Sequence, residues 1–208
     1  MNDNLLFASV NLPILDSTKA TKEILALDSS LSFWDDYRHT QMIPLMTKLG
    51  MHGKQGANNY KQGDFLWLDY TPNVIKEWFE EVVFPWTKLK ARVMALITQP
   101  YVKNYEHIDC ERYEVNTRQH KFRIVLQGET DTLYFKTKQG DISAPKIKKA
   151  FIMDGGWPHG MYNNSKDIKV TLALGAPWKG KEYYNDIDVL LNRDNYKMPD
   201  DLEPYWMK

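Results

Sequence analysis

KFRIVLQ, residues 121–127, alternates bulky apolar side chains with cationic or smaller ones. Successive side chains of a strand point to opposite faces, so this period of two predicts a strand with one face in the core. IKVTLAL, residues 168–174, alternates in the same way. Further short strands are expected at residues 92–98, 132–137 and 150–153. Because glycine-containing turns separate these strands at fairly regular spacing, the sequence predicts a barrel or a jelly-roll sandwich.

The first part of the chain mixes a strand with helices. We expect a strand at residues 5–12 and a short helix from Asp16 to about Leu27, with an N-cap at its start. A clearer helix begins at Thr71–Pro72, since proline suits the first helical position. Apolar residues then recur at helical spacing from Ile75 to Val83. Pro85 should end or kink this helix.

The 208 residues are enough for one well-packed domain. We expect residues 1–90 to form an α/β elaboration with bracing helices and residues 91–178 to form the β-rich core. The segment 179–208, rich in Tyr, Asp, Lys and Asn, should wrap the outside. Residues 33–70 show no clear period and contain a glycine-punctuated loop near 50–59. This aromatic segment is a candidate lid over a substrate.

The composition narrows the function classes. Lys plus Arg number 27 and Asp plus Glu also number 27, so no overall field attracts nucleic acid. The single cysteine, Cys110, can form neither an intrachain disulfide nor a Cys-x-x-Cys zinc site, which favours a reducing compartment. No apolar run approaches the roughly 18 residues of a membrane span. We therefore expect a cytoplasmic protein that binds neither nucleic acid nor membrane; its oligomeric state stays open.

His107 and Asp109 stand two residues apart, and His159 follows 52 residues after the first histidine. Side chains two apart on an extended segment point the same way, and two imidazoles with one carboxylate suit one face of Fe(II). Such a short spacing arises easily by chance, so the stronger evidence for a metal site is the sequence around it. A turn at Pro100–Tyr101 precedes the pair, and the corner at residues 155–158 precedes His159. These turns can bring the three side chains together at a barrel mouth.

Three stretches around these residues resemble the 2-oxoglutarate and Fe(II) dependent dioxygenase superfamily, near its prolyl 4-hydroxylase-like and aspartyl/asparaginyl hydroxylase-like branches. They are TQPYVKNYEHID (98–109), HKFRIVLQG (120–128) and KAFIMDGGWPHGMYNNSKDIKVTLALG (149–175). The resemblance implies a mainly β fold with flanking helices and a double-stranded β-helix core of the jelly-roll, cupin-like kind. It also implies Fe(II) as the metal, 2-oxoglutarate as cosubstrate and molecular oxygen as oxidant.

The resemblance also implies a role for each matching residue. Its three catalytic metal ligands are His107, Asp109 and His159. Lys169, ten residues after the distal histidine, matches the basic residue that binds the distal carboxylate of 2-oxoglutarate. Thr171, on the same strand face, adds a hydroxyl donor. Arg123 is a second candidate for that carboxylate, because aspartyl-hydroxylase-like relatives use an arginine on a nearby strand.

The implied reaction is hydroxylation of a C–H bond in a peptide, an amino acid or another small substrate, with release of succinate and carbon dioxide. Two other functions stay open. One is a cupin-type metal enzyme that does not use 2-oxoglutarate, although such proteins usually supply three or four histidines. The other is a non-catalytic jelly-roll binding module. The sequence does not choose a substrate.

Overall fold

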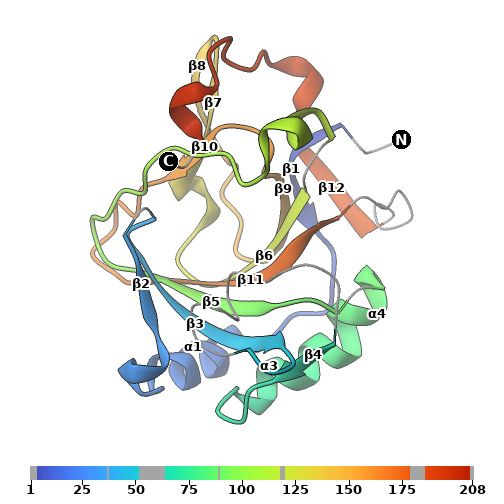
Figure 1. Cartoon of the computed structure of the whole chain (residues 1–208), viewed down its shortest axis with the longest axis vertical. Coiled ribbons are helices and arrows are strands. Elements are labelled where there is room, and N and C mark those ends of the chain that lie inside the picture. The colour runs from blue at the N-terminus through green and yellow to red at the C-terminus, as the bar shows by residue number, and fades with distance from the viewer. Residues whose placement is uncertain are drawn as a thin grey trace.

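The computed structural model describes residues 4–36, 38–51, 64–88, 90–117, 120–178 and 186–206, and the strands of this part form two antiparallel sheets (Figure 1). Within this part of the chain the larger sheet has the order β12-β1-β9-β6-β11-β5-β3-β2, and β4 pairs with β3. Its strands are β1 (Leu5–Val10), β2 (Phe33–Asp35), β3 (Thr40–Lys48), β4 (Phe65–Trp67), β5 (Val93–Thr98), β6 (His120–Gln127), β9 (Ala150–Asp154), β11 (Lys169–Trp178) and β12 (Ile187–Asn192). The smaller sheet contains β7 (Leu133–Thr137), β8 (Gly140–Ser143) and β10 (His159–Met161).

The two alternating segments of the sequence are β6 and β11, and they pair directly near the middle of the larger sheet. On one face of this pair, six side chains join the main hydrophobic core: Phe122, Ile124, Leu126, Val170, Leu172 and Leu174. The opposite face carries Arg123, Lys169 and Thr171 and lines a cavity. The alternation therefore separates the face that stabilises the fold from the face that builds a site.

Helices cover the outer face of the larger sheet (Figure 1). The first is α1 (Ser17–Leu25), which begins at the predicted cap: the Asp16 carboxylate accepts a hydrogen bond from the Lys19 backbone N–H at 3.0 Å. The second helical stretch is continuous through α3 (Asn73–Trp78), a π-helical segment (Phe79–Val83) and α4 (Phe84–Thr87). Short 3₁₀ turns occupy Ser29–Leu31, Arg112–Thr117, Thr130–Thr132, Arg193–Asn195 and Glu203–Tyr205.

Pro85 does not end the second helical stretch at once, because α4 continues to Thr87. Proline has no N–H to donate to the carbonyl four residues earlier, and a π-helical segment lies directly before α4. The π-helical turn is wider than an α-helical turn, so it accommodates Pro85 without a break in the helix. Ile75, Phe79 and Val83 are fully buried on its inner side, as the helical spacing predicted.

Strands β2, β3 and β4 lie in a region for which the sequence predicted no regular structure. Strand β3 pairs with β5 in the larger sheet, and Met42 faces Leu96 across that pair. Strand β3 is buried along almost its whole length, so its sequence, TQMIPLMTK, lacks the alternation of a half-exposed strand. Pro44 coincides with a shift in register, a place where a strand tolerates proline. Of the glycine-punctuated loop expected near 50–59, residues 52 onward lie outside the described part of the chain.

Between the two sheets lies a second hydrophobic cluster, which contains the buried residues Leu6, Phe7, Val125, Leu133, Phe135, Phe151, Met153 and Trp157. This cluster closes one side of the space between the sheets. Towards the C-terminus, β12 extends the larger sheet at β1, and the Tyr205 carbonyl accepts a hydrogen bond from the Ile108 N–H at 2.9 Å. No described helix has the length and apolar character needed to cross a bilayer.

Candidate metal site

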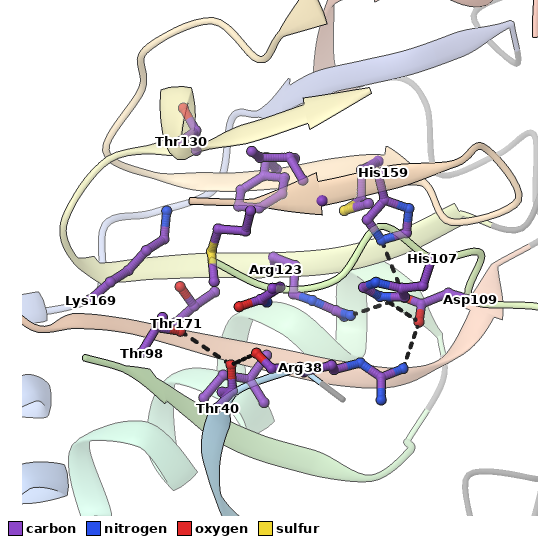
Figure 2. A pocket seen from close by; sticks show the side chains of 17 residues that line it. Arg38, Thr40, Thr98, His107, Asp109, Arg123, Thr130, His159, Lys169 and Thr171 are labelled. Carbon is purple, nitrogen blue, oxygen red and sulfur yellow. Dashed lines mark hydrogen bonds and ion pairs between the residues drawn. The ribbon is translucent and has the colours of Figure 1, made fainter. Parts of the chain in front are cut away.

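His107, Asp109 and His159 converge at one end of the space between the sheets (Figure 2). One ligand atom from each lies within 4.8 Å of the other two. His107 and Asp109 come from the segment that follows β5, and His159 begins β10. The two histidines form an isolated antiparallel bridge, so main-chain pairing brings the distant parts of the sequence together.

Backbone carbonyls fix the ring orientation of both histidines. His107 Nδ1 lies 2.9 Å from the Tyr105 carbonyl, and His159 Nδ1 lies 2.8 Å from the Trp157 carbonyl. A carbonyl only accepts, so each Nδ1 carries the proton and each Nε2 keeps its lone pair. The two Nε2 atoms lie 3.5 and 3.9 Å from the Asp109 carboxylate oxygens. Burial and the adjacent His107 lower the pKa of His159 to about 3, which keeps it neutral.

Cations surround the Asp109 carboxylate. The Arg38 guanidinium donates to Oδ1 at 3.0 Å, and Arg123 Nη2 lies 3.7 Å from Oδ2. Burial alone would raise the pKa of Asp109, but the charges of Lys121 and Arg38 hold it well below its usual range. The carboxylate is therefore ionised, as a metal ligand must be.

The donor set fits Fe(II). Two neutral imidazole nitrogens and one ionised carboxylate form the 2-His-1-carboxylate set that leaves open coordination positions on a non-haem ferrous ion. Both imidazoles have their second nitrogen hydrogen-bonded, which orients the ligands before any metal binds. The three residues are almost completely buried, so the same set is shielded from bulk water.

A cavity of about 100 Å³ extends from these three residues between the sheets. All six site residues expected from the sequence line it: His107, Asp109, Arg123, His159, Lys169 and Thr171. Figure 2 shows Lys169 at the end of the cavity opposite the three candidate ligands, whereas Arg123 reaches towards Asp109. The cavity therefore has a ligand end and a cationic end.

Lys169 is 5% exposed and begins β11, opposite Thr98 of β5. Its ammonium donates to the Glu129 carbonyl and to the Thr132 hydroxyl. Burial lowers the pKa of Lys169 to about 8, although the charges of Asp131 and Glu129 oppose that effect. Burial removes water from the ammonium and so disfavours its charged form. A bound anion would stabilise that charged form in place of the lost hydration.

Gly128 makes room for the stem of Lys169. Its φ of +93° lies in a region that residues with a side chain rarely adopt, and a Cβ there would lie 3.1 Å from Lys169 Cγ. The turn after β6 therefore packs against the lysine. Thr171, two residues further along the same face of β11, is 7% exposed and directs its side chain into the cavity (Figure 2).

Sequence reasoning missed five polar residues that line the cavity: Arg38, Thr40, Thr98, Asn104 and Thr130. Arg38 lies 71 residues before Asp109, and no local sequence motif predicts the contact between them. Asn104 is 7% exposed, and its side-chain oxygen is buried without a hydrogen-bond partner among the described residues. The alternation of β5 places Thr98 on the inner face with Leu96, which is a signal that the sequence contained.

No protein-family model matches the chain, and no curated protein matches it. Solved structures do. The chain is similar to HygX from Streptomyces hygroscopicus, solved with nickel and 2-oxoglutarate bound: TM-score 0.54, 10% identity, 84% of each chain covered. It is also similar to a prolyl hydroxylase from Trichoplax adhaerens, solved with a peptide fragment of the hypoxia inducible factor oxygen degradation domain: TM-score 0.52, 11% identity, 87% of this chain and 86% of that one covered. The chain therefore has the double-stranded β-helix fold of the 2-oxoglutarate and Fe(II) dependent oxygenases, as its sequence predicted.

Proposed function

We propose that this protein is a 2-oxoglutarate and Fe(II) dependent oxygenase that hydroxylates a C–H bond of a small molecule or a peptide. One observation carries the proposal: a single cavity has a 2-His-1-carboxylate set at one end and a buried lysine at the other. The fold it shares with HygX, a protein solved with 2-oxoglutarate bound, supports the same assignment.

In this proposal the Nε2 atoms of His107 and His159 and the Asp109 carboxylate hold Fe(II). Together with 2-oxoglutarate and molecular oxygen, the bound iron supplies oxidation of a C–H bond coupled to formation of succinate and carbon dioxide. Lys169 binds the distal carboxylate of 2-oxoglutarate through its ammonium, and Thr171 donates its hydroxyl to the same cosubstrate.

Arg123 has a different role in the proposal. Its guanidinium lies beside Asp109, with Nη2 3.7 Å from the carboxylate, and its Nη1 donates to the Phe122 carbonyl at 3.0 Å. It therefore supports the ligand end of the cavity, and Lys169 remains the candidate for the distal carboxylate. Arg38 holds the other oxygen of Asp109, so the two guanidinium groups together fix the orientation of that carboxylate.

Apolar side chains limit access of water to the cavity. Five of them line its walls: Leu96, Leu133, Phe151, Met153 and Met161. Exclusion of water strengthens the charge interactions of Lys169 and Asp109 and protects a reactive oxidant from side reactions. The chain thus contributes ligands, a cation and a dry environment, while the bound groups contribute the redox chemistry.

The test is anaerobic titration of 2-oxoglutarate into the Fe(II)-loaded protein, followed by succinate formation when oxygen is admitted. We expect 2-oxoglutarate to bind in the presence of metal and succinate to form only with iron and oxygen. A cupin-type metal enzyme would bind the metal and ignore 2-oxoglutarate. A non-catalytic module would purify without metal and bind none on titration, and either result would reject the proposal.

A further inference from the structure

The turn between β9 and β10, residues 155–158, holds two of the three candidate metal ligands through its carbonyl groups. The Gly155 carbonyl accepts a hydrogen bond from the Asp109 N–H at 2.8 Å. The Trp157 carbonyl lies 2.8 Å from Nδ1 of His159 and orients its ring. A displacement of this turn would therefore move the carboxylate ligand and rotate one of the imidazole ligands.

Asp154, the last residue of β9, fixes the shape of this turn from inside the protein. Its side chain is fully buried, and its Oδ1 accepts a hydrogen bond from the Gly156 N–H at 2.9 Å. A Cβ added at Gly156 would lie 3.1 Å from the same oxygen and 3.1 Å from the Val115 carbonyl oxygen, so the turn fits closely around the carboxylate. The positions of the two carbonyls that hold the ligands therefore depend on the position of the Asp154 carboxylate.

Arg193 supplies a positive charge to this buried carboxylate. Its Nη1 donates to Asp154 Oδ2 at 2.5 Å, and its side chain is 15% exposed. Charges removed from water require partners that replace the lost hydration, and removal of one partner of a buried pair is strongly destabilising. We therefore expect loss of Arg193 to shift the Asp154 carboxylate and, with it, the turn.

Arg193 also contacts the turn itself, because its guanidinium lies over the Trp157 ring, 5.2 Å from the ring centroid. The indole is 2% exposed, and its Nε1 donates to the Lys136 carbonyl of β7 at 2.7 Å. The ring of Trp157 is thus fixed on two sides. Its backbone carbonyl, which orients His159, has correspondingly little freedom to move.

The backbone of Arg193 is anchored at the edge of the larger sheet. Its N–H donates to the Asn4 carbonyl at 2.8 Å, and β12, which directly precedes it, pairs with β1. The Asn192 side chain caps the 3₁₀ turn that begins at Arg193, since its oxygen accepts a hydrogen bond from the Asp194 N–H at 2.8 Å. The guanidinium therefore reaches the β9–β10 turn from a fixed position.

Two other ion pairs of residues 186–206 lie at the surface. Arg112 and Glu203 have side chains that are 64% and 59% exposed, and Lys138 and Asp200 have side chains that are 40% and 85% exposed. Exposed pairs of this kind contribute little to stability. Of these three pairs, the one between Arg193 and Asp154 is buried and adjoins the residues that hold the metal ligands.

We infer that Arg193 is a positioning residue for the metal site: through Asp154 and Trp157 it fixes the β9–β10 turn, and the turn orients His159 and Asp109 towards the metal. The inference rests on the proposed function, because that function requires a metal at these ligands. It adds a residue from the C-terminal part of the chain on which the affinity and the coordination geometry of the metal depend.

The experiment is anaerobic titration of Co(II) into the metal-free full chain, followed by calorimetry and by visible absorption, which reports the coordination geometry of this ion. Arg193→Gln should lower Co(II) affinity about 10- to 100-fold, the range for residues that orient a metal ligand. It should also change the shape of the absorption spectrum of the metal-saturated protein. Arg193→Lys keeps the charge without the planar donors and should regain part of the affinity.

A double variant separates the buried charge from the shape of the side chain. Asp154→Asn keeps an oxygen that can accept from the Gly156 N–H, and it removes the carboxylate charge that Arg193 compensates. A buried ion pair can often be replaced by neutral groups at little cost, so the two changes should compensate each other. We expect Asp154→Asn with Arg193→Gln to bind Co(II) at least roughly threefold more tightly than Arg193→Gln alone.

Two controls separate positioning from a general loss of stability. Ile24→Val destabilises the core at helix α1, on the outer face of the larger sheet, and Lys138→Gln removes the exposed pair with Asp200. Both should leave Co(II) affinity within about twofold of wild type and the spectrum unchanged.

Wild-type affinity and spectrum in Arg193→Gln would reject the inference and leave the metal site standing, as would an equal change in Ile24→Val. If Arg193→Gln does not fold, Arg193→Lys decides: reduced affinity with an altered spectrum supports the inference, and wild-type values reject it. If the wild-type chain binds no Co(II), the proposed function itself fails, and the inference fails with it.

Discussion

The backbones of His107 and His159 pair with each other: the His107 N–H donates to the His159 carbonyl at 2.8 Å, and the His159 N–H donates to the His107 carbonyl at 3.0 Å. Their rings lie 4.5 Å apart between centroids. The separation of the two imidazoles is therefore set by main-chain hydrogen bonds between distant segments. A site built in this way is formed before the metal arrives, and its ligands need little reorganisation on binding.

Substitution of His159 should remove metal binding without unfolding the chain. Loss of a residue that only orients a metal ligand lowers metal affinity about 10- to 100-fold. His159→Ala removes a ligand itself, so its effect should be larger. We therefore expect a loss of more than roughly 100-fold in Ni(II) or Fe(II) affinity by anaerobic calorimetry. Circular dichroism of the metal-free variant checks the fold. Wild-type affinity in the folded variant would show that the metal binds elsewhere.

The alternation of two strands predicted which face of each carries the candidate site residues. The period of two in residues 121–127 and 168–174 separates the core face from the cavity face, so Arg123, Lys169 and Thr171 were expected on one side. Arg38 could not be found in this way. It reaches Asp109 across 71 residues, from a turn between two strands whose sequences show no period.

Lys169→Ala should separate cosubstrate binding from metal binding. The ammonium lies at the end of the cavity opposite the ligands, so its loss leaves the donor set intact (Figure 2). We expect 2-oxoglutarate affinity to fall at least roughly 100-fold, because a buried charge-assisted contact is lost, and Ni(II) affinity to change less than threefold. Two calorimetric titrations measure both quantities. Equal loss of the two would mean that Lys169 acts through the fold.

Binding of 2-oxoglutarate should weaken as the pH rises above 8. Burial lowers the pKa of Lys169 to about 8, so the protonated form that attracts a carboxylate is fully present below this pH and is lost above it. The affinity should fall by up to about tenfold for each further pH unit. Lys169→Arg is the matched variant, since arginine keeps its charge throughout. A pH profile shared by both proteins would assign the effect to another group.

Arg38 should act as a positioning residue for Asp109. Arg38→Gln removes the guanidinium that donates to Asp109 Oδ1 at 3.0 Å and leaves the carboxylate without that support. We expect metal affinity to fall about 10- to 100-fold, the range for residues that orient a metal ligand. Arg38→Lys should restore part of the loss, because it keeps the charge but not the planar pair of donors.

The control for Arg38 is an ion pair on the surface. Lys90 lies 2.6 Å from Glu80, and the two side chains are 54% and 38% exposed. Lys90→Gln should leave metal affinity unchanged and alter the free energy of unfolding by less than about 1 kcal/mol. If both variants affected metal binding alike, Arg38 would have no special relation to Asp109.

Gly160 should tolerate no side chain while Tyr134 is present. A Cβ at Gly160 would lie 2.5 Å from the Tyr134 hydroxyl oxygen and 2.6 Å from Cζ, and the ring cannot withdraw without losing its 2.8 Å hydrogen bond to Glu106. We expect Gly160→Ala to lower the free energy of unfolding by about 1 to 3 kcal/mol, measured by urea denaturation.

A double-mutant cycle identifies the cause of that loss, because coupling between two residues in contact appears as non-additivity. Tyr134→Ala removes the ring that the new methyl would strike, so Gly160→Ala should be nearly neutral in that background. Tyr134→Phe removes only the hydroxyl and leaves Cζ 2.6 Å from the added Cβ, so the destabilisation should persist there. Gly160 directly follows the candidate metal ligand His159. The absence of a side chain at this position allows Tyr134 to pack against β10. Additive effects of Gly160→Ala and Tyr134→Ala would show that the glycine is required for another reason.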